Sequence, residues 1–151
     1  MSVTEFLSAD DVHLLTEVGM VGVGARLHVS ARALFEALAV LRPERDFPWI
    51  GQAAVWLNRG QADEAVRVLQ QACAGTARSP VQGPMPSDDL TMLNAFLGFA
   101  QHMARRTAES QQTMRAVLAM PYHPHAHAMA KDMLGLNTQT PLFSSVQEQT
   151  T

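Results

Sequence analysis

Apolar residues recur along this chain at three- and four-residue spacing, which predicts a series of amphipathic helices. The first helix is expected over residues 9–23, with Gly22 and Gly24 breaking it. The second is expected over 29–41 and is stopped by Pro43. The chain therefore begins as a pair of helices joined by a short turn.

The helix pair recurs at a fixed offset of 34 residues along the sequence. This offset superposes Ala31 on Ala65, Phe35 on Leu69, Leu15 on Trp49, and Gly19 on Ala53. It is the period of the tetratricopeptide repeat, in which two antiparallel helices pack through small residues. The second repeat is the clearest, and residues 58–61 form the turn between its helices.

A third repeat follows an insertion rich in Gly, Pro, Ser and Thr, which predicts a loop over 74–87. This repeat departs from the pattern, because Arg105 stands at the turn-glycine position and Ser110 at the small-alanine position. A seventh helix is expected over 124–136, where it would cover the exposed side of the third repeat. The residues predicted to cover that side are Ala128, Met129 and Met133.

These patterns predict an all-α fold of about three tetratricopeptide-like helix-turn-helix pairs with a C-terminal capping helix. Apolar residues make up 47% of the chain and aromatic residues only 6%, a composition that suits helix pairs. We expect a flexible N-terminus over 1–8, a single helical domain over 9–136, and a disordered tail over 137–151.

Composition and charge exclude several classes of protein. The formal net charge is -3, and the sequence has no run of basic residues that could follow a phosphate backbone. Nucleic acid is therefore not an expected partner. Cys73 is the only cysteine, which excludes an intramolecular disulfide. Residues 1–11 lack the pattern of a signal peptide, and no window has the length and hydropathy of a membrane span. A soluble cytoplasmic protein is expected.

No constellation of residues predicts catalysis, a metal site or a cofactor. His123, His125 and His127 alternate, but Pro124 separates the first two and their rings are expected to diverge, with no Cys, Asp or Glu beside them. Adventitious surface histidines are favoured over a metal protein, which stays as an alternative. Cys73 and His102 lack an oxyanion hole, and a buried structural thiol explains Cys73 better. We therefore expect that the protein is not an enzyme.

The informative surface is the concave face, which the first helix of each repeat lines. The positions predicted to form a protein-binding groove there are Met20, Val23, Phe47, Ile50, Ala54, Leu57, Met92, Ala95, Phe99 and Met103, with Thr16 beside them. Only Asn58 could bind a terminal carboxylate, so a carboxylate clamp is not expected. An apolar, methionine-rich groove suits the nonpolar face of a partner segment. Alternatively, some of these residues belong to the core, or the seventh helix or a second copy of the chain covers them.

Residues 15–24, His28 and residues 57–60 resemble the small tetratricopeptide chaperones of bacterial type III secretion systems that sequester the needle subunit. Residues 41–43 also resemble the related Hrp-type secretion proteins, and the similarity covers roughly residues 12–75. The loop over 74–87, the third repeat and the tail do not match that family.

The resemblance implies a cytoplasmic, non-enzymatic chaperone without a cofactor. Its partner would be a secreted helical needle or filament subunit, or a translocated effector, held by an amphipathic segment in the concave groove. A small helical co-chaperone and a homodimer are further possible partners. The alternative is a scaffold or homodimeric interaction protein without secretion cargo.

Overall fold

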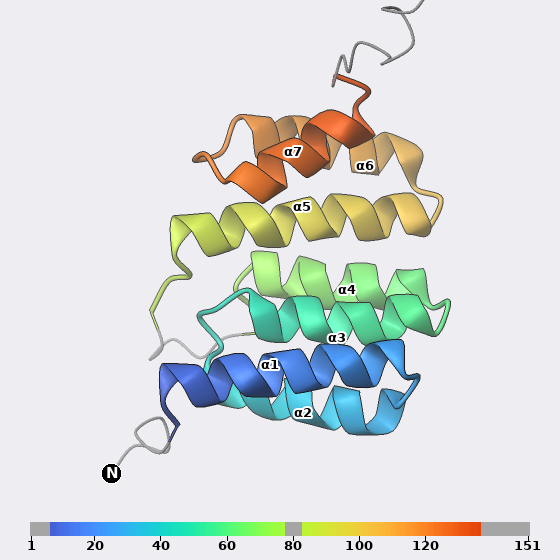
Figure 1. Ribbon diagram of the computed structural model, residues 1–151. Coiled ribbons are helices and arrows are strands. Elements are labelled where there is room, and N and C mark those ends of the chain that lie inside the picture. Colours follow the sequence, from blue (N-terminus) through green and yellow to red (C-terminus); the bar gives the residue numbers. More distant parts are fainter. Residues whose placement is uncertain (1–6, 78–82, 137–151) are drawn as a thin grey trace, which may run out of the picture.

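The computed structural model describes residues 7–77 and 83–136, and these residues fold as seven helices (Figure 1). The helices are α1 (Ala9–Gly24), α2 (His28–Leu41), α3 (Phe47–Asn58), α4 (Ala62–Cys73), α5 (Ser87–Met103), α6 (Thr107–Leu118) and α7 (Pro124–Met133). Residues 1–6 of the predicted N-terminus, the centre of the predicted loop and the predicted tail lie outside the described residues. The all-α prediction is confirmed.

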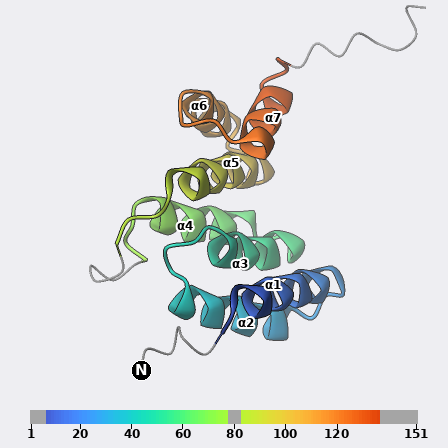
Figure 2. The same cartoon turned by 60° about the vertical axis from the view of Figure 1, so that its left-hand side comes forward.

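The helices pack in sequence as antiparallel pairs, which confirms the predicted repeat architecture. α1 pairs with α2, α3 with α4, and α5 with α6, while α7 packs on both α5 and α6. The first helices of the pairs also touch one another, because α1 contacts α3, and α3 contacts α5. The pair α1–α2 forms one end of the stack and α7 lies at the other, as Figures 1 and 2 show from two directions.

The positions that the 34-residue offset matches form the core. Phe35 and Leu69 are wholly buried, and the small residues Ala31 and Ala65 lie where the paired helices approach closely. Trp49 is buried as well, and its indole Nε1 donates a hydrogen bond to the Pro43 carbonyl oxygen at 3.1 Å. The repeat signature is therefore a packing signature, with a satisfied polar atom at its largest side chain.

Each turn within a pair contains one residue in the left-handed backbone conformation. Gly60 has φ 74° in the second pair, and Arg26 and Arg105 occupy the equivalent places with φ 61° and 63°. The prediction that Gly22 and Gly24 break the first helix was wrong at Gly22, because the helix continues to Gly24 and the chain reverses at Arg26. An arginine in this conformation costs more than a glycine.

The third pair keeps the repeat geometry despite its unusual residues. Ser110 is buried where an alanine was expected, and its hydroxyl donates a hydrogen bond to the Gly98 carbonyl oxygen at 2.7 Å. This bond satisfies the hydroxyl inside the close contact between α5 and α6.

The capping helix is shorter than predicted and presents other residues. It ends at Met133 instead of residue 136, because Gly135 adopts φ 70° and the Leu136 amide donates back to the Lys131 carbonyl oxygen. Met129 and Met133 pack on the third pair as predicted, but Ala128 is exposed. The residues of α7 that are buried instead are Ala126, His127 and Ala130.

None of the described helices combines the length and the apolar character that crossing a membrane requires.

Candidate functional site

The first helices α1, α3 and α5 form one layer of the stack, and their side away from α2, α4 and α6 is the concave face. On α5, Met92, Phe96, Phe99 and Met103 recur at four- and three-residue spacing, so they share one side of the helix. The first three are half-buried and Met103 is exposed. The rings of Phe96 and Phe99 meet edge to face, with centroids 6.5 Å apart.

Ala95 lies deeper than its neighbours Met92 and Phe99, which pack against the same cluster but stay half-buried. It is wholly buried against Met114 of α6 and Ala126 of α7. Phe96, which sequence reasoning missed, lies on the concave side. The heptad-like spacing of Met92, Phe96 and Phe99 was the signal that could have found it.

The α3 residues predicted for the groove keep part of their surface accessible. Phe47, Ile50, Ala54 and Leu57 are all half-buried. Ile50 and Leu57 pack on the core shared with α4 and α5, whereas Phe47 and Ala54 pack on the core shared with α2. They are the outer layer of two adjacent core clusters, so a partner could bury them further.

On α1 the two predicted residues separate. Met20 is exposed, with 45% of its surface accessible, whereas Val23 is buried against Phe35 and Leu38. Thr16 is half-buried and its hydroxyl donates to the Val12 carbonyl oxygen. We call the accessible apolar set the concave row. It consists of Met20, Phe47, Ile50, Ala54, Leu57, Met92, Phe96, Phe99 and Met103.

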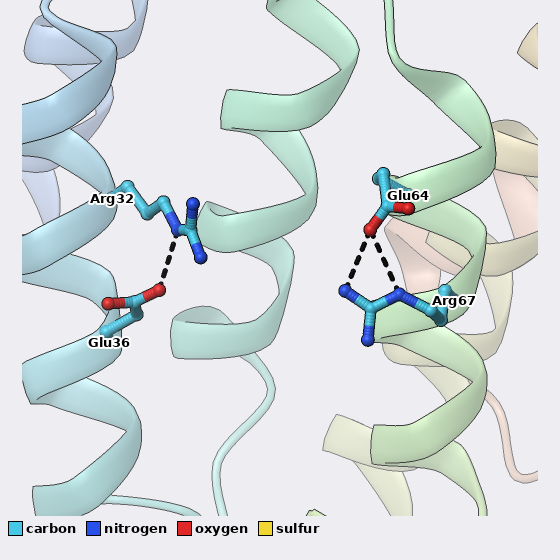
Figure 3. A network of polar contacts seen from close by, with 4 residues as sticks. All are labelled: Arg32, Glu36, Glu64 and Arg67. Atoms are coloured by element: carbon cyan, nitrogen blue, oxygen red, sulfur yellow. Dashed lines mark hydrogen bonds and ion pairs between the residues drawn. The ribbon is translucent and has the colours of Figure 1, made fainter.

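The opposite side of the stack carries charge. Arg32 donates to Glu36 within α2, and Arg67 donates twice to Glu64 within α4 (Figure 3). The Arg32 guanidinium also lies 4.9 Å from the centre of the Trp56 ring. These exposed pairs add little stability, but they make this side polar while the concave row is apolar.

A pocket of about 340 Å³ adjoins one end of the concave row, where Thr16 and Phe47 belong to its wall. His13, Arg42 and Arg45 add basic groups to the same wall. Arg42 makes no ion pair with any residue that the structure describes. This basic edge was not predicted, because only the first helix of each pair was expected to line the concave face. Arg42 and Arg45 belong to the segment between α2 and α3.

Arg45 is held in place by a carboxylate from a distant part of the chain. Asp89, near the beginning of α5, accepts from Arg45 Nε at 2.7 Å and from the Asp46 amide at 3.0 Å. Burial and the nearby charge of Asp89 raise the pKa of Asp46 to about 6. Asp89 therefore holds in place the segment that carries Arg42 and Arg45. Its negative charge also disfavours the ionised form of Asp46.

Two of the histidines near α7, His123 and His127, have structural roles. His123 Nδ1 accepts from the Ala126 amide and caps α7, and the ring of His127 packs on Tyr122 at 5.0 Å between centroids. The prediction that the rings of His123 and His125 diverge was wrong, because their centroids lie 5.9 Å apart. No group of three or more His, Cys, Asp or Glu side chains among the described residues is arranged to hold a metal ion.

Cys73 and His102 do not meet. Arg106, just after α5, pairs with Asp63 at the beginning of α4, which places His102 beside that end of α4. Cys73 is the last residue of α4 and packs, half-buried, against the central core.

Comparison with known proteins adds no further assignment. No protein-family model matches the chain, and no curated protein matches it either.

Proposed function

We propose that this protein is a type III secretion chaperone whose concave row binds an amphipathic helical segment of an exported needle or filament subunit, or of a translocated protein. The observation that carries the proposal is the concave row itself: nine accessible or half-buried apolar residues on three adjoining helices. The resemblance of residues 12–75 to chaperones of this class supports it.

The dimensions of the row suit a helix as the partner. Packed helices lie about 8–10 Å apart, so a row across α1, α3 and α5 extends roughly 20 Å. A helix of about 13 residues covers that distance at 1.5 Å per residue. Met20, Met92 and Met103 have flexible side chains that can adjust to its apolar ridge.

Binding of this kind would prevent assembly without an energy source. A filament subunit polymerises through an apolar stripe, and burying the stripe contributes about 25 cal/mol for each Å² removed from water. Because the chaperone binds only the monomer, mass action keeps the subunit from polymerising. The protein therefore needs neither ATP nor a catalytic residue for this role.

The basic edge further defines the partner segment. The pocket with His13, Arg42 and Arg45 adjoins Phe47 of the concave row, and Thr16 belongs to its wall. A carboxylate on the partner would form a charge-assisted hydrogen bond with Arg42 there. We therefore expect an acidic side chain at that end of the bound segment.

The test is affinity capture from a lysate of the source organism with wild-type protein and with variants. Leu57→Asp, Phe96→Asp and Phe99→Asp each place a charge in the concave row and should abolish capture while preserving helicity. Val29→Asp is the matched control, because Val29 is 84% exposed on α2, outside the row.

Two outcomes would reject the groove as the site that binds a secreted protein. One is capture of the same secreted protein by wild type and all three groove variants. The other is recovery of the chain's own copies alone, lost only in the groove variants, which would identify a homodimer or scaffold whose grooves fill each other.

A further inference from the structure

The two ends of the helix stack differ in polarity. At the C-terminal end, α7 turns His125, Lys131 and Asp132 toward solvent. At the other end, α1 and the turn after it leave Leu14, Val18, Val21 and Leu27 each more than half exposed. Terminal units of helical repeats need a polar outer face to remain soluble. At the α1–α2 end these apolar residues interrupt that outer face, beside the exposed ion pair of His13 and Glu17.

The exposed residues form a continuous apolar face. Leu14, Val18 and Val21 follow one another at helical spacing along α1. Beside them lies a shallow cleft of about 110 Å³ between α1 and α2 that has no charged residue in its wall. The residues of this wall are Val18, Gly19, Gly22, Leu27, Ser30, Ala31 and Leu34. We call this surface the α1 face.

Charged residues stand at both ends of the α1 face. Asp10 lies in the first turn of α1 and Arg26 lies just beyond its last residue. Neither makes an ion pair with a residue in the described part of the chain. Val18 is midway between them in sequence. If two α1 helices pack antiparallel about Val18, each Asp10 comes opposite the Arg26 of the other copy, whereas parallel packing places like charges together.

We propose that a second copy of this chain binds the α1 face and forms a two-fold symmetric dimer. Symmetry of this kind pairs one self-complementary surface with itself. The face has an apolar centre and complementary charges at its two ends, as such an interface requires. The inference does not rest on the proposed function, because the α1 face and the concave row are different surfaces.

The size of the face predicts how tight the dimer is. α1 has 16 residues and is about 24 Å long at 1.5 Å per residue, and α2 beside it widens the face to about 20 Å. An interface of roughly 500 Å² per copy is smaller than the standard of about 800 Å². The dimer should therefore dissociate on dilution, at micromolar rather than nanomolar concentrations.

Sedimentation velocity of the full chain over a series of concentrations tests the proposal. Wild type should shift from monomer to dimer as the concentration rises. Val18→Glu should raise the dissociation constant at least about a hundredfold, because two charges would be buried at the dimer axis. Val29→Glu is the control, since Val29 is more exposed than Val18 but lines a different pocket with Arg32 and Arg59. It should dimerise as wild type does.

Charge reversal tests the antiparallel arrangement. Asp10→Arg and Arg26→Asp should each weaken the dimer about tenfold, and the double variant should return to within about threefold of wild type. Asp tolerates the left-handed backbone at position 26. Circular dichroism of each variant verifies folding.

Three results would overturn the proposal: a wild-type chain that stays monomeric at every concentration, equal disruption by Val18→Glu and Val29→Glu, or no recovery in the double charge reversal. A monomer whose α1 face binds a helix from another protein would give the first of these.

Discussion

Replacing Gly51 by alanine should destabilise the protein, although alanine is the better helix former. The Phe35 ring is wholly buried between α1 and α3. A Cβ at Gly51 would lie less than 3.0 Å from three atoms of that ring. The ring cannot retreat toward α1, because a Cβ at Gly19 would already lie 2.6 Å from Phe35 Cζ. Both glycines therefore make room for one aromatic ring.

The magnitude follows from two opposing effects. Overpacking a core costs about 1–3 kcal/mol, and replacing glycine inside a helix returns up to about 1 kcal/mol. Gly51→Ala should therefore lower the free energy of unfolding by about 1–2 kcal/mol, or the melting temperature by about 3–8 °C for a domain of this size. Gly24→Ala is the control, since nothing lies within 4 Å of a Cβ there. It should be neutral or stabilising.

Urea unfolding followed by circular dichroism at the helical band measures both variants. Adding Phe35→Leu to Gly51→Ala should remove the clash, so the double variant should lose less stability than the two single variants together. The reasoning fails if Gly51→Ala is as stable as Gly24→Ala, or if the two substitutions at the clash are additive.

Three further predictions follow from the site and the turns. Arg42→Glu should reduce capture of the secreted partner at least about tenfold without changing stability, since it reverses the charge of the basic edge. The pKa of Asp46 is raised to about 6 in the folded protein. Wild type should therefore gain roughly 1–3 kcal/mol relative to Asp46→Asn as the pH falls from 7 to 4, and urea titrations at each pH test this sign. Arg105→Gly should stabilise the fold by about 1 kcal/mol and Gly60→Ala should destabilise it by about as much, because both positions have a positive φ; thermal melts distinguish the two directions.

The fold was predictable because packing repeats along the sequence. Matched small and large residues such as Ala31, Ala65 and Phe35 occupy equivalent buried places. The turns were harder to predict, since Arg26 and Arg105 adopt a conformation that glycine takes at residue 60. The packed helices on both sides hold these two arginines in a strained backbone conformation. A local sequence pattern does not show this packing.

The candidate site was predictable only in part. α5 contacts α3, α4, α6 and α7, so nearly its whole circumference is apolar and periodicity alone does not identify the side that faces the concave surface. Ala95 was therefore predicted for the groove although it is buried, and Phe96, which is half-buried, was not. The basic edge depends on the Arg45–Asp89 contact between residues far apart in sequence, which helix periodicity does not encode.

The central claim is that the concave row holds a secreted helical subunit. The most direct measurement is light scattering on the complex eluted after affinity capture from the source organism, with mass spectrometry of its components. The account predicts a stoichiometric complex between this chain and a small helical secretion subunit, absent when Phe96→Asp is used as bait. Recovery of only a self-associated oligomer would contradict it.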